Sequence, residues 1–218
     1  MPQSLGRAGW LALSEAVVRW IAGIDEDDVR PTAERAREWL EDSIHRGEPF
    51  ATPPSYFAVI CNESLALATW IAGGDPRPHF REVLPLHRAA WDALGSKPSD
   101  EEMREEYLPG YVRGCCAARE FAAGAEACER HGGRQLDSED DVQTPLELAA
   151  WICRQGEDVD PPFHAMTAAR VLREPLADWV ANGHGVTAGL WIELVFFEFG
   201  PHRSASEAFR VARKFVAG

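Results

Sequence analysis

Four side chains of the kind that bind metal ions lie close together near the middle of the sequence: Cys115, Cys116, Cys128 and His131. The apolar spacing around them predicts one continuous helix over residues 111–130. On such a helix Cys116 and Cys128 lie about 18 Å apart along the axis, too far to share one ion. Cys128 and His131 share a face, but two ligands are too few for a structural zinc site. The sequence therefore predicts buried thiols in this helix, and neither a metal nor another cofactor.

A glycine-rich stretch near the C-terminus, Gly183-His184-Gly185-Val186-Thr187-Ala188, partly matches the phosphate-binding turn of dinucleotide folds. That turn must follow a strand, because its backbone N–H groups have to point at a pyrophosphate. Here a helix ending near Val180 precedes the stretch, and Asn182-Gly183 is typical of a helix C-terminus. We expect a turn between two helices, with His184 as a titratable group on it.

The other titratable residues form no recognised catalytic set. Glu41 and His45, like Asp160 and His164, are four residues apart, which is the spacing of ordinary contacts on one helix face. The chain has no His-Glu-x-x-His motif and no Gly-x-Ser-x-Gly nucleophile turn. The sequence therefore predicts that the protein is not an enzyme.

Acidic residues dominate the charge of the chain. The 35 Asp and Glu residues outnumber the 22 Lys and Arg residues, giving a formal net charge of -13, of which the first 199 residues carry -16. Such a surface repels nucleic acid and anionic membranes, and it attracts a basic partner. The predicted partner-binding residues are the acids of three segments: Asp25, Glu26, Asp27, Asp28, Asp100, Glu101, Glu102, Glu105, Glu106, Asp137, Glu139, Asp140 and Asp141.

Helical spacing of apolar residues dominates the rest of the chain, so we expect an all-α fold of about eight to ten helices. Pro31 and Pro76 are placed at the first turns of their helices, with Asp75 as an N-cap. Three capping boxes mark later helix starts: Ser99 with Glu102, Thr144 with Glu147, and Ser204 with Glu207. The expected helices cover residues 10–24, 31–46, 55–72, 76–94, 111–130, 161–180 and 190–199.

The last of these segments, residues 190–199, is apolar almost all round. We interpret it as a buried central helix. A buried strand is the alternative, since the run is short and rich in Val, Ile and Phe. The acidic run at 137–141 is expected to be a surface loop.

A repeated motif organises the helices. Residues 20–25 read Trp-Ile-Ala-Gly-Ile-Asp, residues 70–75 read Trp-Ile-Ala-Gly-Gly-Asp, and residues 148–158 hold a looser third copy. We interpret each copy as the turn of a helical hairpin, with Trp20, Trp70 and Trp151 buried and paired with a second tryptophan of the same hairpin. The chain is then a single domain over 1–218, an irregular bundle or repeat-like array, with 1–97 and 98–218 as candidate sub-units sharing one core.

The location of the protein is predicted from its N-terminus and its cysteines. Glu15 interrupts the first apolar stretch, which excludes a signal peptide there, and no window is long enough for a membrane span. Five cysteines are an odd number, typical of reduced thiols in the cytosol. We expect a cytoplasmic protein.

The turns at 20–25 and 70–75, the helix start Thr144-Pro145-Leu146-Glu147-Leu148 and the acidic charge resemble the all-helical immunity proteins of bacterial polymorphic toxin systems. The resemblance implies a protein without catalytic residues that binds a cognate toxin in the cytosol and occludes its active site. It also implies a basic partner, such as a nuclease, toward which the acidic loops imitate nucleic-acid phosphate.

Two alternatives remain open at this stage. A helical scaffold or adaptor would present an aromatic groove to a peptide or protein in place of an acidic face. An enzyme acting on a small ligand would need polar groups converging on a pocket in the bundle core, with His79, His87 and His164 as the first residues to consider.

Overall fold

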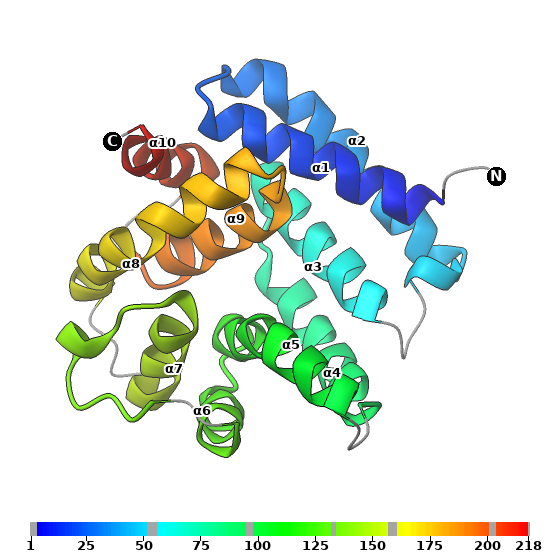
Figure 1. Ribbon diagram of the computed structural model, residues 1–218. Coiled ribbons are helices and arrows are strands. Elements are labelled where there is room, and N and C mark those ends of the chain that lie inside the picture. The colour runs from blue at the N-terminus through cyan, green and yellow to red at the C-terminus, as the bar shows by residue number, and fades with distance from the viewer. Residues whose placement is uncertain are drawn as a thin grey trace.

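The computed structural model describes residues 4–51, 56–94, 98–131, 134–156, 161–200 and 204–217. Within these ranges the chain forms ten α-helices and no strand, packed as helical hairpins around a common core (Figure 1). The all-α prediction is therefore confirmed. The helices described are α1 (Leu5–Ile21), α2 (Glu26–His45), α3 (Tyr56–Ile71), α4 (Arg77–Asp92), α5 (Pro98–Ala117), α6 (Phe121–Arg130), α7 (Pro145–Gln155), α8 (Pro161–Ala181), α9 (Gly185–Ile192) and α10 (Ala205–Val216).

The first two copies of the repeated motif are the turns of two hairpins, α1–α2 and α3–α4, as predicted. Each turn contains one glycine in the left-handed region, Gly23 at φ 98° and Gly73 at φ 88°, where a residue with a Cβ is strained. In the third copy α7 continues three residues beyond Ile152, and residues 157–160 of its turn lie outside the described ranges. None of the helices that the structure describes is both long and apolar enough to span a lipid bilayer.

The two helices at the centre of the chain differ from the prediction. The expected continuous helix over 111–130 is wrong, because α5 ends at Ala117 and α6 begins at Phe121. Arg119 adopts φ 62°, and the N–H of Glu120 donates to the carbonyl of Cys115 (2.9 Å), which closes the helix as a C-terminal cap. No glycine marks this break. The guanidinium of Arg119 lies over the Phe199 ring (5.1 Å), which holds the unusual turn in place.

This break also changes the argument about the cysteines, since Cys116 and Cys128 are on different helices. Cys116 Sγ lies 3.1 Å from Cys153 Sγ of α7, and Cys115, Cys116, Cys128 and Cys153 are all buried and free. Burial raises the pKa of Cys115 to about 12, so this thiol stays protonated. In the part of the chain that the structure describes, no three metal-binding side chains come together.

Several helix starts are shifted from their predicted positions. The second helix begins at Glu26 and not at Pro31, because Asp25 caps it by accepting from the N–H of Asp27 (3.1 Å). At α4 the cap is Pro76, one residue later than predicted, although the Asp75 carboxylate does accept from the N–H of Arg77 (3.1 Å).

The capping boxes are largely confirmed where they are described. Both hydrogen bonds of the box between Thr144 and Glu147 are present, and Ser204 Oγ accepts from the N–H of Glu207. Ser99 is not an N-cap, because α5 already begins at Pro98, and the side chain of Ser99 lies outside the described residues.

The segment over residues 190–199 is helical, as predicted, and the strand alternative is wrong. It begins as α9 and continues as a π-helical turn, Glu193–Glu198, whose wider backbone the apolar pattern does not signal.

The predicted burial of the tryptophans is confirmed for Trp20 and Trp70, each 2% exposed, whereas Trp151 is only partly buried. The partners of the buried pair differ from the prediction. Phe209 of α10 stacks on Trp20 (ring centroids 4.3 Å apart) and also contacts Trp70 (5.7 Å), while Phe197 contacts Trp70 from the other side (5.5 Å). The two N-terminal hairpins are thus joined through rings of the C-terminal segment. We call Trp20, Trp70, Phe197 and Phe209 the core ring cluster.

Candidate functional site

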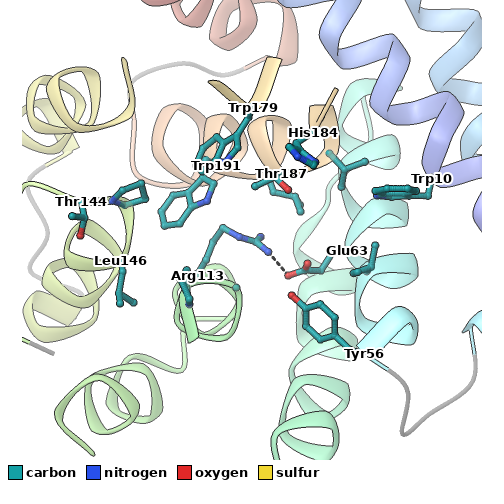
Figure 2. Close-up of a pocket in the computed structure, with 16 residues that line it drawn as sticks. Trp10, Tyr56, Glu63, Arg113, Thr144, Leu146, Trp179, His184, Thr187 and Trp191 are labelled. Atoms are coloured by element: carbon teal, nitrogen blue, oxygen red, sulfur yellow. Dashed lines mark hydrogen bonds and ion pairs between the residues drawn. The ribbon is translucent and has the colours of Figure 1, made fainter. Parts of the chain in front are cut away.

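A pocket of about 560 Å³ opens on one side of the bundle, between α1, α3, α5, the start of α7, α8 and α9 (Figure 2). Four aromatic side chains from four different helices line it: Trp10 of α1, Tyr56 of α3, Trp179 of α8 and Trp191 of α9. We call these four residues the pocket ring cluster. The pocket volume lies within the range of about 300–1,000 Å³ typical of small-molecule sites.

A second hollow of about 380 Å³ continues the pocket past Trp10 and Ile60, which line both. Arg7 and Phe57 complete it, and Phe57 is 54% exposed although it is a large apolar side chain. Aromatic and apolar side chains therefore make up most of the lining of these two hollows.

Close contact between α9 and α1 positions the upper wall of the pocket. Ser14 Oγ of α1 donates to the carbonyl of Gly183 (2.6 Å) and accepts from the N–H of Gly185 (2.8 Å). A Cβ on Gly185 would lie 2.1 Å from the carbonyl oxygen of Ser14, so only glycine allows this approach. The glycine-rich stretch thus forms a turn between two helices, as predicted, and it places His184 and Thr187 on the rim of the pocket.

Charged side chains form the floor of the pocket. The Glu63 carboxylate of α3 accepts hydrogen bonds from His87 Nε2 of α4 (2.9 Å) and from Arg113 Nη2 of α5, and all three side chains are buried. Gly114 makes room for this arrangement, because a Cβ there would lie 2.9 Å from His87 Nε2. Figure 2 shows Arg113 extending from α5 across the pocket toward Glu63.

The electrostatics of the floor keep Glu63 ionised. Burial by itself raises the pKa of this carboxyl, but attraction to Arg113 and His87, together with their hydrogen bonds, outweighs burial and lowers the pKa below its usual value. Arg113 is not fully paired in return. Its Nη1 is buried and has no hydrogen-bond partner, so two N–H donors of a buried cation are left unused.

The lining residues offer little for covalent chemistry. Among the described residues that line the pocket there is no Cys or Ser, and the hydroxyl groups belong to Tyr56, Thr144 and Thr187. Glu63 is a poor general base, since its lowered pKa and its two hydrogen bonds stabilise the ionised form.

The histidines named by the enzyme hypothesis are not brought together by the described residues. His79 Nε2 lies 3.3 Å from Thr69 Oγ1, whereas His87 is bonded to Glu63 two turns further along α4. The side chain of His164 lies outside the described residues, and exposed His184 is on the rim of the pocket.

The three acidic segments lie in separate parts of the molecule. In Figure 1 the turn before α2 is at the top beside α10, the start of α5 is at the lower right, and the loop before α7 is at the left. The segment at 25–28 is partly neutralised, because Glu26 pairs with Arg30 and accepts from Ser206 Oγ of the basic α10. The structure therefore brings the acids of each segment together, but it does not join the three segments.

The segment at 137–141 lies in the loop between α6 and α7, and its last three residues, Glu139–Asp141, form a 3₁₀ turn. Asp141 accepts from the N–H and the hydroxyl of Ser138 (3.0 Å each), and these bonds lower the pKa of Asp141. Glu139 is buried, at 5% exposed. Local structure accounts for these two acids.

The start of α5 presents three exposed carboxylates, those of Glu101, Glu102 and Glu105. Glu101 lies 3.7 Å from Arg104, whose guanidinium donates to the carbonyl of Leu94. The side chains of Asp100 and Glu106 lie outside the described residues.

The pocket residues were not singled out as a site in the sequence, although two signals were present. Glu63 is the one charged residue of α3, and Arg113 lies among small residues in α5. A charged residue on an otherwise apolar face is expected to be buried only with a partner. The pairing itself could not be predicted, because Glu63 and Arg113 are fifty residues apart.

No family model matches the chain, and a comparison with curated proteins and with solved structures gives no significant match. The geometry of the pocket and the distribution of charge therefore carry the functional argument.

Proposed function

We propose that this protein binds a small organic ligand with an aromatic or apolar body in the pocket between α1, α3, α5, α8 and α9. The observation that supports this best is the pocket ring cluster, four aromatic side chains contributed by four helices around about 560 Å³. Aromatic walls with a few polar groups at one end are the usual composition of small-molecule sites. The described lining residues contribute aromatic, apolar and ion-paired groups, and this composition suits ligand binding.

Filling the mouth of the pocket tests this proposal. Thr187 is exposed on the rim, so Thr187→Phe narrows the opening at little cost to folding. Glu34→Phe, on the exposed face of α2 and away from the pocket, adds the same side chain as a matched control. We expect a neutral probe, indole-3-acetamide, to bind the wild type and the control equally in ligand-observed NMR, and to bind Thr187→Phe at least about fivefold more weakly. Equal binding to all three proteins would contradict the proposal.

A second candidate function follows from the charge. We propose as the alternative that the protein is an immunity-type inhibitor, which neutralises a basic toxin or effector domain in the bacterial cytosol by occluding its active site. The net charge of -13 and the exposed carboxylates of Glu101, Glu102 and Glu105 support it. Since the acidic segments are separated, such a partner would be held mainly at the start of α5.

Charge reversal distinguishes this alternative. Capture of partners from the producing cells is compared at low and moderate salt for the wild type and for the triple variant Glu101→Lys, Glu102→Lys, Glu105→Lys. A triple reversal of Asp25, Asp27 and Asp28 is the control. The alternative predicts a basic partner that the α5 variant loses and the control retains, because charge steers such association. Recovery of no basic partner at either salt would count against it, as would a neighbouring gene unrelated to toxins.

A further inference from the structure

We infer that the ligand of this pocket carries a carboxylate, which binds the unpaired Nη1 of Arg113. This inference rests on the proposed small-ligand function. It is based on the hydrogen bonds of the buried Arg113 guanidinium. Nη2 is bonded to Glu63, whereas Nη1 is buried without a partner.

The position of Arg113 makes this group a recognition element. The side chain is 4% exposed, and its guanidinium lies inside the pocket that Trp191 and Tyr56 line (Figure 2). Unused donors on a buried guanidinium are costly, and an ionised oxygen is the acceptor that satisfies them best.

The charges around Arg113 favour a monoanion. Glu63 is ionised next to it, and His87 faces the same carboxylate from α4. Glu193 of the π-helical turn also interacts with Arg113, but burial and the neighbouring Glu198 raise the pKa of Glu193 well above its usual value, which keeps it neutral. One remaining pair of N–H donors beside a carboxylate suits a single carboxylate oxygen, whereas Glu63 would repel a phosphate dianion.

The pocket ring cluster supplies the complementary part of the site. Trp179 and Trp191 are nearly parallel (12°) with centroids 6.4 Å apart, and they form one wall above Arg113. Tyr56 is held on the opposite side by stacking on Tyr107 (3.7 Å). A flat apolar body between these rings, with a carboxylate reaching down to Arg113, satisfies both the walls and the floor.

Matched probes test the inference. The dissociation constants of indole-3-acetate and indole-3-acetamide, which differ in one group, are measured by calorimetry and ligand-observed NMR at pH 7. A charge-assisted hydrogen bond predicts that the acid binds the wild type about tenfold or more tightly than the amide. Arg113→Lys keeps a positive charge for Glu63 but loses the second terminal nitrogen of the guanidinium, so it should lower the preference for the acid over the amide to below about threefold.

A second variant covers the case in which Arg113→Lys does not fold. The double substitution Glu63→Gln, Arg113→Met removes both charges together, so that neither is left buried alone. It should bind the acid and the amide equally. Inorganic phosphate, added as a competitor, should not displace indole-3-acetate at concentrations where benzoate does.

The outcomes separate the inference from the function on which it rests. Equal binding of both probes to the wild type, with binding lost in Thr187→Phe, would overturn the carboxylate and leave the ligand-binding function standing. An unchanged preference in Arg113→Lys would also overturn it, and so would effective competition by phosphate. Failure of both probes to bind the wild type more tightly than Thr187→Phe would overturn the inference and the proposed function together.

Discussion

Two groups of aromatic side chains, built from similar residues, have different surroundings in this molecule. In the core ring cluster Trp20 and Trp70 are each 2% exposed and pack on Phe209, although Trp70 and the partly buried Phe197 also line a separate hollow. The pocket ring cluster surrounds an open space of about 560 Å³ with a charged floor. Tryptophan content alone therefore says little about function. Open space beside aromatic rings, together with an incompletely paired charge, indicates a binding site.

The largest loss of stability is expected for a substitution in the core ring cluster. Replacing Trp20 by Ala removes a fully packed ring between α1 and α10 and should lower the free energy of unfolding by about 3–5 kcal/mol. Chemical denaturation followed by circular dichroism measures this loss. Trp39→Ala on α2, which removes a half-buried tryptophan, is the matched control and should cost less. Equal losses would mean that the core ring cluster has no special role in the fold.

The second-largest loss of stability is expected when the charged floor of the pocket is changed. Glu63→Gln leaves Arg113 without its counter-ion and should cost about 3 kcal/mol at pH 7. Because the pKa of Glu63 is lowered in the fold, its stabilisation is present above the ordinary carboxyl pKa and is lost as the pH falls through the folded value. The gap between wild type and variant should therefore close on acidification.

Measurement of unfolding free energies between pH 3 and pH 8 tests this pH dependence. Glu82→Gln, on the exposed face of α4, is the control and should stay within about 0.5 kcal/mol of the wild type throughout. A gap that widens toward low pH would contradict the account of Glu63.

The contact that positions the upper wall should show a slightly smaller effect. Gly185→Ala places a Cβ 2.1 Å from the backbone oxygen of Ser14, so α9 must move away from α1 at a cost of about 2–3 kcal/mol. Thermal unfolding gives the stability change, and the binding of indole-3-acetamide reports the displaced wall. Thr187→Ala on the exposed face of the same helix should have nearly wild-type stability. An unshifted melting temperature in Gly185→Ala would show that this contact is not tight.

The smallest effect on stability is expected in the pocket ring cluster. Trp179 is half-buried and contacts Trp191 (6.4 Å), so Trp179→Ala should cost about 1 kcal/mol and weaken binding of indole-3-acetamide about three- to tenfold. Calorimetric titration measures the affinity. If the variant lost several kcal/mol of stability but still bound the probe normally, Trp179 would have a structural role and not a binding role.

The sequence predicts the parts of this fold that local patterns determine. Apolar spacing locates the helices, and the two Trp-Ile-Ala-Gly turns locate the hairpins, because Gly23 and Gly73 are required where the backbone is left-handed. The break between α5 and α6 escapes prediction, since Arg119 occupies the left-handed position that glycine usually takes. The Arg119 side chain contacts Phe199 and Glu198, about eighty residues away, and no local pattern reveals such contacts.

The pocket is harder to predict for the same reason. Its walls come from six parts of the chain, and Trp10 and Trp191 are brought together only when α9 packs on α1 through Gly185. The acidic segments were easier to recognise because they are contiguous in sequence. Their structure shows local roles for several of them, such as the cap that Asp25 provides for α2 and the turn that Asp141 closes.

We claim that a ligand binds at the pocket ring cluster and not at the core ring cluster. The indole N–H signals of the tryptophans test this, because one NMR spectrum contains signals from both clusters. On titration with indole-3-acetate, we expect the signals of Trp10, Trp179 and Trp191 to shift together with one dissociation constant. The signals of Trp20 and Trp70, which do not line this pocket, should stay in place. Shifts confined to tryptophans outside the pocket, or equal shifts in both clusters, would contradict the assignment of the pocket ring cluster as the binding site.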